Sequence, residues 1–109
     1  QEAAAQAEAR VAEEAHRFAA RLQTLDAHAN IGRLTRWAEA VRQDELGRSR
    51  RLIDGLTDDQ REHVDAMTRA LVKKMLHGPI RAMREAAEAG DAERVQGLLA
   101  AFEDDHEAR

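Results

Sequence analysis

The sequence predicts an all-α protein with about five helices. Apolar residues recur at steps of three and four, which places them on one face of an α-helix. One proline, six glycines and 3% aromatic residues leave little material for a β-sheet. Residues that typically begin or end helices, such as Thr57 and Gly90, separate the periodic segments. We therefore expect helices throughout, beginning with a long N-terminal helix.

The first predicted helix covers about residues 2–26. It carries one apolar stripe about seven turns long, and its opposite face is charged. Residues 26–30 interrupt this pattern, and Asn30 has the side chain of an N-cap. The stripe consists of Ala4, Ala7, Val11, Ala15, Phe18, Leu22 and Leu25.

The second predicted helix runs from about Ile31 to Ile53. Its stripe includes Leu34, and Gly47 favours a bend because glycine weakens a helix interior by roughly 1 kcal/mol relative to alanine. Gly55 follows the helix as the expected left-handed cap.

Three further helices are predicted after this turn. Thr57 and Gln60 have the spacing of a capping box, which opens the third helix. We expect that helix to end at His77, where a protonated imidazole stabilises the last carbonyls. Pro79 would then begin a fourth helix ending near residue 89, and Asp91 would cap the fifth.

The core that these helices can form is thin. Hydrophobic residues make up 43% of the chain, but about half of them are alanine. A small domain with few large apolar side chains gains stability by covering a surface with a second copy, so we expect a homodimer. The sequence leaves open which residues form the core and which the interface, and whether the copies run parallel or antiparallel. The residues expected in the core or interface are Val11, Phe18, Leu22, Leu25, Ile31, Leu34, Val64, Met67 and Leu71.

No catalytic, cofactor-binding or metal-binding residues are predicted. The chain has no cysteine, and no two glycines have the G-x-G spacing of a dinucleotide loop. Glu13 with His16 and Glu103 with His106 match the spacing of metal ligands in helical bundles. The first pair points away from the apolar stripe and the second lies in the acidic tail, so we interpret both as solvated charges.

The overall charge argues against a general nucleic-acid-binding protein, since the net charge is −4. The second helix is nevertheless basic, and Trp37 within it could stack on a base. We interpret its cations as a solvated face, and we keep a tRNA-binding module centred on this helix as the alternative. The candidate tRNA contacts are Arg48, Arg50 and Arg51.

Three segments together resemble a known family. They are residues 34–46, residues 68–79 with the sequence Thr-Arg-Ala-Leu-Val-Lys-Lys-Met-Leu-His-Gly-Pro, and residues 84–91. The chain resembles the C-terminal dimerisation domain of glutamyl-tRNA reductase over nearly its whole length. Lys73 and Ile80 stand where that family often has Asn and Thr. By this resemblance residues 1–27 are the end of a long spinal helix, and residues 30–109 form a helical bundle.

The resemblance implies a parent enzyme that reduces glutamyl-tRNA to glutamate-1-semialdehyde with NADPH, in the biosynthesis of tetrapyrroles such as porphyrins and haem. It implies that this chain itself performs no chemistry, holds no cofactor and joins the subunits of a V-shaped homodimer. Further implied partners are glutamyl-tRNA and glutamate-1-semialdehyde aminotransferase. We expect a cytoplasmic location and no membrane contact.

Overall fold

The protein is an extended arrangement of four helices. The computed structural model describes residues 2–107, with side chains for residues 2–103, and contains no strand in that part of the chain. It measures 79 × 31 × 17 Å. The all-α prediction is confirmed. The helices are α1 (Glu2–Arg48), α2 (Arg50–Asp54), α3 (Asp58–Glu88) and α4 (Ala92–Glu107).

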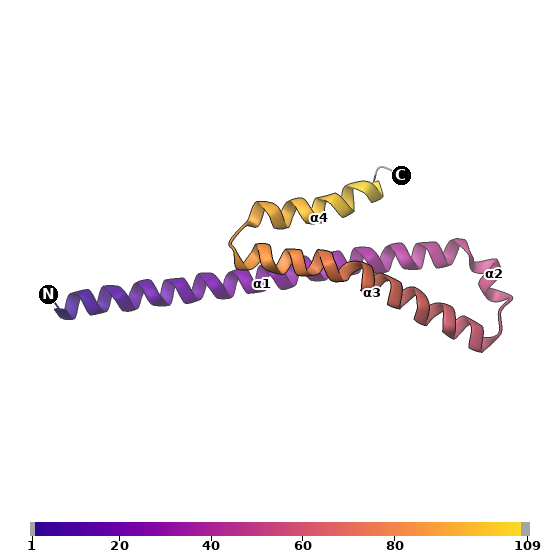
Figure 1. The fold of residues 1–109 in the computed structure, drawn as a ribbon, viewed down its shortest axis with the longest axis horizontal. Coiled ribbons are helices and arrows are strands. Elements are labelled where there is room, and N and C mark those ends of the chain that lie inside the picture. Colours follow the sequence, from indigo (N-terminus) through magenta and orange to yellow (C-terminus); the bar gives the residue numbers. More distant parts are fainter. Residues whose placement is uncertain (1, 108–109) are drawn as a thin grey trace.

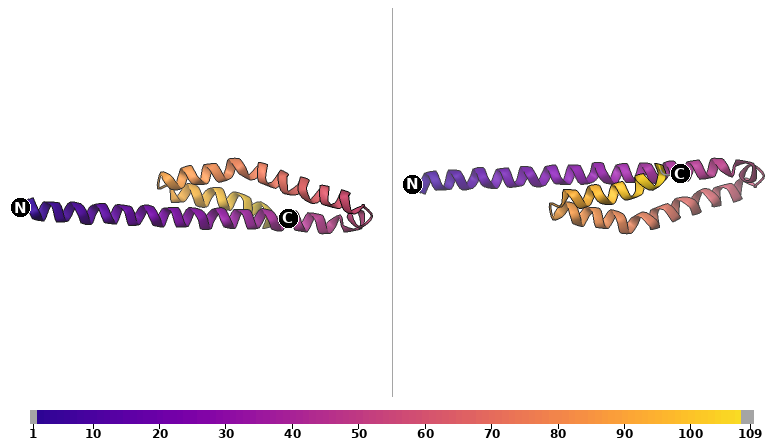
Figure 2. Two further views of the ribbon diagram at one scale, coloured as in Figure 1. Left: turned by 90° about the horizontal axis from the view of Figure 1, so that it is seen from below. Right: turned by 90° about the horizontal axis from the view of Figure 1, so that it is seen from above.

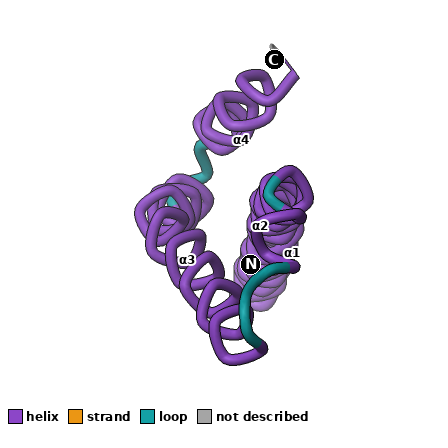
Figure 3. Tube along the Cα trace, turned by 90° about the vertical axis from the view of Figure 1, so that its right-hand side faces the viewer, coloured by secondary structure: helices purple, strands orange, loops and turns teal. Residues whose placement is uncertain are grey.

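Helix α1 runs nearly the full length of the molecule, and the others gather along its C-terminal half (Figure 1). Helix α3 returns antiparallel to α1, and α4 turns back again to lie against both. Viewed along the long axis, α1, α3 and α4 stand at the corners of a triangle (Figure 3). The N-terminal half of α1 therefore extends alone.

The predicted break at residues 26–30 is wrong, because α1 is continuous from Glu2 to Arg48. Asp26 and Asn30 are weak helix formers, but each costs only a fraction of a kcal/mol inside a helix. Ala27, Asn30 and Ile31 are partly buried in the folded protein, so packing outweighs this cost. Asn30 is consequently an interior residue and not an N-cap. The second predicted helix is instead divided shortly after Gly47, because α1 ends at Arg48 and Ser49 separates it from α2.

The predicted boundary at His77 is also wrong, because α3 passes through Pro79. Proline removes one helical hydrogen bond, at a typical cost of about 3 kcal/mol. The residues on both sides of Pro79 form one buried face, which includes Leu76, Ile80 and Met83. Burial of this face offsets the lost hydrogen bond, and α3 bends in its middle without ending (Figure 2). His77 therefore caps no helix end.

Besides Asn30 and His77, the sequence predicts four caps, and three of these four are confirmed. Thr57 Oγ1 accepts from the Gln60 backbone at 3.2 Å, and the Gln60 side chain accepts from the Thr57 backbone at 2.9 Å. Gly90 has a φ of 72°, and Asp91 Oδ1 accepts from the Arg94 backbone at 3.0 Å. Gly55, expected to be left-handed, has a φ of −80°.

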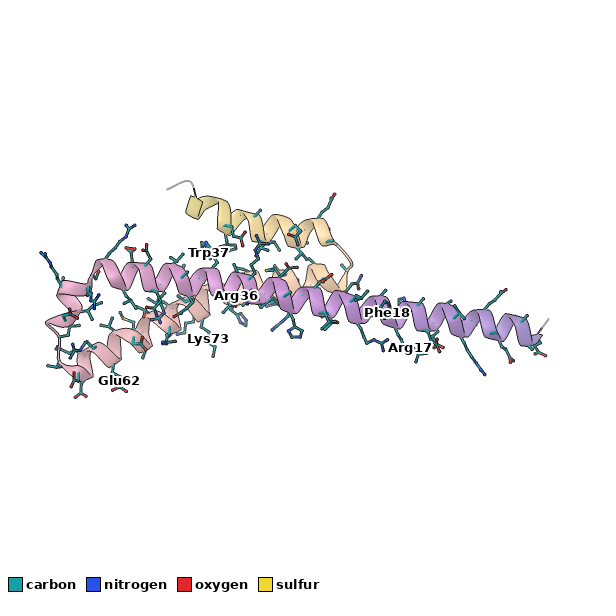
Figure 4. All side chains as sticks on the ribbon, turned by 180° about the vertical axis from the view of Figure 1, so that it is seen from behind. Arg17, Phe18, Arg36, Trp37, Glu62 and Lys73 are labelled. Carbon is teal, nitrogen blue, oxygen red and sulfur yellow. The ribbon has the colours of Figure 1, made fainter. Side chains whose placement is uncertain are left out.

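The core lies where α1, α3 and α4 meet. Leu34 of α1, Met83 of α3 and Leu99 of α4 are each 1% exposed or less. At its edge, the rings of Trp37 and Phe102 pack edge to face at 5.6 Å between centroids, and Figure 4 shows Trp37 in the space between α1 and α4. The core is small, and it stabilises only the middle of the molecule.

A buried arginine joins α1 to α3 beyond this core. Arg42 is 4% exposed, and its guanidinium donates to both Glu39 carboxylate oxygens at 2.6 and 3.0 Å. It also donates to Asp65 at 3.2 Å and to Thr68 at 3.1 Å on α3. The hydrogen bonds from Arg42 and Gln43 lower the pKa of Glu39 from 4.5 to about 2. Hydrogen bonds from Arg69 and then Arg42 likewise lower the pKa of Asp65.

The capping box makes a stability prediction. Thr57→Ala removes the hydroxyl that accepts from Gln60, and it should destabilise the protein by about 1 kcal/mol. Thr57→Ser keeps the acceptor and should stay close to the wild type. Urea unfolding followed by circular dichroism measures both variants, and equal midpoints for Thr57→Ala and the wild type would contradict the assigned cap.

The lowered pKa of Glu39 predicts a pH dependence. Because the folded protein favours the ionised carboxylate, the contribution of Glu39 to the free energy of unfolding is complete above pH 4.5 and is lost as the pH falls towards 2. Glu39→Gln should be less stable than the wild type at pH 7, and the difference should shrink through this window. Thermal unfolding between pH 2 and 7 gives the two curves. Parallel curves would be inconsistent with an ionised Glu39 bonded to Arg42.

Candidate self-association surface

The N-terminal half of α1 carries an exposed apolar stripe. Every residue from 2 to 26 is exposed, and Phe18 is 57% exposed. Figure 4 shows Phe18 on a stretch of α1 that no other helix covers. The Arg21 guanidinium lies 6.0 Å from the centre of the Phe18 ring. Val11, Leu22 and Leu25 are 67%, 47% and 64% exposed.

A second apolar surface lies at the other end of the molecule. There α1 and α2 diverge from the N-terminal half of α3, and the space between them is an open groove of about 600 Å³. Phe102 of α4 is among the residues that line this groove. Its apolar lining includes Val41, Leu46, Leu52, Ile53, Val64 and Met75.

The edge of this groove on α3 projects into solvent. Val64 is half-buried, whereas Met67, Leu71 and Met75 are 47%, 53% and 74% exposed. These four residues, which we call the α3 stripe, follow one another at steps of three and four and so share a face of the helix. Leu52 on α2, at the opposite edge, is 75% exposed. A hollow and a ridge, both apolar, thus lie side by side.

The residues expected in the core or interface fall into three groups. Leu34 is fully buried, and Ile31 packs against the same core. Val64, Met67 and Leu71 belong to the α3 stripe. Val11, Phe18, Leu22 and Leu25 are on the exposed part of α1.

Leu52 and Met75 were not among the residues expected in the core or interface, although the sequence places Met75 on a broad apolar face of the third predicted helix. A signal for Met75 was present, because the apolar residues 64, 67, 71 and 75 face about 100° away from residues 72 and 76 on the same helix. An apolar face this wide exceeds what one neighbouring helix covers. The position of Leu52 at the edge of the groove depends on how α2 turns away from α1. No local sequence pattern indicates the direction of that turn.

The three candidate arginines for tRNA contact are all exposed at the junction of α1 and α2. Arg48 forms an ion pair with Asp44 at 3.5 Å, and Arg50 forms one with Asp54 at 4.0 Å. These exposed pairs contribute little stability, but they reduce the local positive charge.

The described residues do not form the metal sites that the Glu-x-x-His spacings could have indicated. Glu13 and His16 are exposed, Glu103 pairs with Arg33 at 2.6 Å, and the His106 side chain is outside the described residues. No three histidine, aspartate or glutamate side chains among residues 2–103 are grouped as metal ligands would be. Among residues 2–107, no helix combines the length and apolar character that a membrane crossing requires.

Comparison with known proteins identifies the family. Residues 6–104 match the family described as "Glutamyl-tRNAGlu reductase, dimerisation domain". The chain is 36% identical over 90 residues to a glutamyl-tRNA reductase of Chloroflexus aurantiacus and 41% identical over 91 residues to one of Rubrobacter xylanophilus. A glutamyl-tRNA reductase 2 of Koribacter versatilis is 38% identical over 96 residues.

These alignments cover 83%, 84% and 88% of the chain, but only 21%, 21% and 22% of the three relatives. The chain thus spans about a fifth of the length of the curated relatives it matches. No solved structure matches it. The family match covers nearly all of α1 to α4 and confirms the resemblance, so the chain belongs to the family of glutamyl-tRNA reductase dimerisation domains.

Proposed function

We propose that this chain joins two copies of a glutamyl-tRNA reductase and takes no part in the chemistry itself. The observation that carries this proposal is the amount of large apolar surface left uncovered by the chain's own fold. Eight large hydrophobic side chains are between 47% and 75% exposed. Monomeric proteins seldom leave such residues in continuous patches, which typically mark contact surfaces.

The parent activity is part of the same proposal. By family resemblance, the whole enzyme reduces glutamyl-tRNA to glutamate-1-semialdehyde with NADPH in the cytoplasm, and glutamate-1-semialdehyde aminotransferase receives the product. The described residues do not fit a dinucleotide, since four of the six glycines lie inside helices and Gly55 and Gly90 follow helix ends. NADPH binding and reduction are therefore assigned to other parts of the parent enzyme.

The first test is the assembly state of the 109-residue chain. Sedimentation velocity across a wide concentration range should give a dimer that dissociates on dilution, because a reversible association follows mass action. The dissociation constant should depend only weakly on salt, because the exposed surface is apolar. A folded species that remains monomeric at the highest concentration would refute the proposal for this chain.

A second candidate function is contact with the tRNA of the parent enzyme. Between Asp26 and Glu39 helix α1 has no acidic residue, and neither has α3 between Asp65 and Glu85. These stretches lie alongside each other, since Arg42 bonds to Asp65 while His28 and Arg84 line one hollow. Four cations in this band form no ion pair with the described residues, and Figure 4 shows Lys73 pointing away from α4. They are Arg36, Lys73, Lys74 and Arg84.

This band, more than the three arginines at residues 48–51, has the charge to bind phosphates. Reversal of Arg36, Lys73, Lys74 and Arg84 to glutamate should weaken tRNA binding about tenfold or more and reduce its dependence on salt. Reversal of Arg48, Arg50 and Arg51 serves as the matched control and should have a smaller effect. Fluorescence anisotropy with labelled tRNA at two salt concentrations measures both. Equal binding by the band variant and the wild type would exclude this contact.

A further inference from the structure

We infer that Met67 and Met75 form an oxidation-sensitive pair, and that conversion of their thioethers to sulfoxides by a peroxide weakens the self-association of the chain. Both residues belong to the α3 stripe, and a methionine sulfoxide is polar where methionine is apolar. This inference rests on the proposed function, because it needs an association that oxidation can weaken. It adds a site of modification and a means of control to that function.

The three methionines of the chain differ in exposure. Met75 and Met67 are 74% and 47% exposed, whereas Met83 is 1% exposed and lies in the core. Oxidation of a methionine depends on the access of the oxidant to its sulfur. The fold therefore presents two of its three thioethers to a small oxidant and shields the third.

No other sulfur group in the chain competes for the oxidant. The sequence has no cysteine, so it has no thiolate, the group that peroxides oxidise most readily. Met67 and Met75 are separated by two steps of four residues through Leu71, so the two sulfurs lie on the same face of α3. Oxidation at either position therefore changes the same surface.

A peroxide alone supplies this oxidation. The thioether sulfur attacks one oxygen of hydrogen peroxide, and the O–O bond breaks as the S–O bond forms. The second oxygen takes the proton of the transferred oxygen and leaves as water, so the sulfur loses two electrons and the peroxide gains them. Reversal requires two thiols of a methionine sulfoxide reductase, which become a disulfide while the sulfoxide oxygen leaves as water.

A sulfoxide is poorly suited to burial beside the groove that Met75 helps to line. Its oxygen is a hydrogen-bond acceptor, and burial of such a group without a donor is costly. Among the polar side chains of the groove, Arg42 and Thr68 already donate to other groups. Glu45, when ionised, only accepts. A second copy that covered the α3 stripe would bury the sulfoxides among few donors, so their formation favours separate chains.

The apolar stripe on the N-terminal half of α1 contains no methionine. Its large exposed residues are Val11, Phe18, Leu22 and Leu25, and these hydrocarbon side chains do not react with peroxide under mild conditions. Self-association through that stripe alone would therefore be insensitive to the oxidant. The response to peroxide thus depends on the participation of the α3 stripe.

The first measurement maps the oxidation. The 109-residue chain is treated with hydrogen peroxide at low protein concentration, and cleavage after Arg69 and Arg81 places the three methionines on separate peptides for mass spectrometry. Met67 and Met75 should gain oxygen at least about tenfold faster than the shielded Met83. Equal rates at all three positions in the folded chain would overturn the inference.

The second measurement is the dimer dissociation constant, obtained by sedimentation velocity before and after peroxide treatment, with circular dichroism as the check on helix content. Oxidation of the wild type should raise this constant at least about tenfold. The double variant Met67→Leu and Met75→Leu keeps the stripe apolar, so it should dimerise like the wild type and lose the response. Met83→Leu is the matched control, because a swap of similar volume is tolerated in a core, and it should keep the response.

The outcomes separate the inference from the proposed function. An unchanged dissociation constant after oxidation, or an equal response in the double leucine variant, would overturn the inference while the proposed function stood. Recovery of the original constant after treatment with methionine sulfoxide reductase would support it. A wild-type chain that never dimerises before treatment would refute the proposed function, and the inference with it.

Discussion

The fold depends on one small contact, where Leu34, Met83 and Leu99 exclude water between three helices. This cluster is large enough to hold α3 and α4 against the C-terminal half of α1, but not to extend to either end of the molecule. The N-terminal half of α1 therefore has no neighbour, and α3 parts from α1 on the other side. The limited supply of large apolar side chains thus determines both the elongated shape and the presence of uncovered apolar surface.

Two residues shape the contact between α1 and α3 at this end of the molecule. The guanidinium of Arg42 is buried between α1 and α3, and it needs polar partners that an apolar core cannot supply. Glu39, Asp65 and Thr68 meet this need, so the apolar contact between the two helices is interrupted here. Pro79 bends α3 in its middle, and the bend directs the N-terminal half of that helix away from α1. The groove extends to both sides of Arg42, which lines it together with Thr68.

The features that sequence reasoning predicted correctly are those with local causes. The Thr57 capping box, the helix stop at Gly90 and the Asp91 cap each depend on side chains or a backbone conformation within a few residues. The continuity of α1 through Asn30 and of α3 through Pro79 depends on burial against distant helices, which overrides local preference. For the same reason the sequence could identify Leu71 and Phe18 as apolar positions without separating one surface from the other. The Arg42 network was not predicted, because Asp65 and Thr68 approach it only after α3 folds back.

The continuity of α1 matters for the proposed assembly. A break at residues 26–30 would have allowed the N-terminal segment to take many directions, whereas one unbroken helix fixes its direction relative to the groove. A two-fold contact that included the C-terminal half of α1 would then determine how the two N-terminal halves are placed, since each is the continuation of the same helix. Because the bundle holds α1 only along its C-terminal half, it leaves the N-terminal half of this helix uncovered within the single chain.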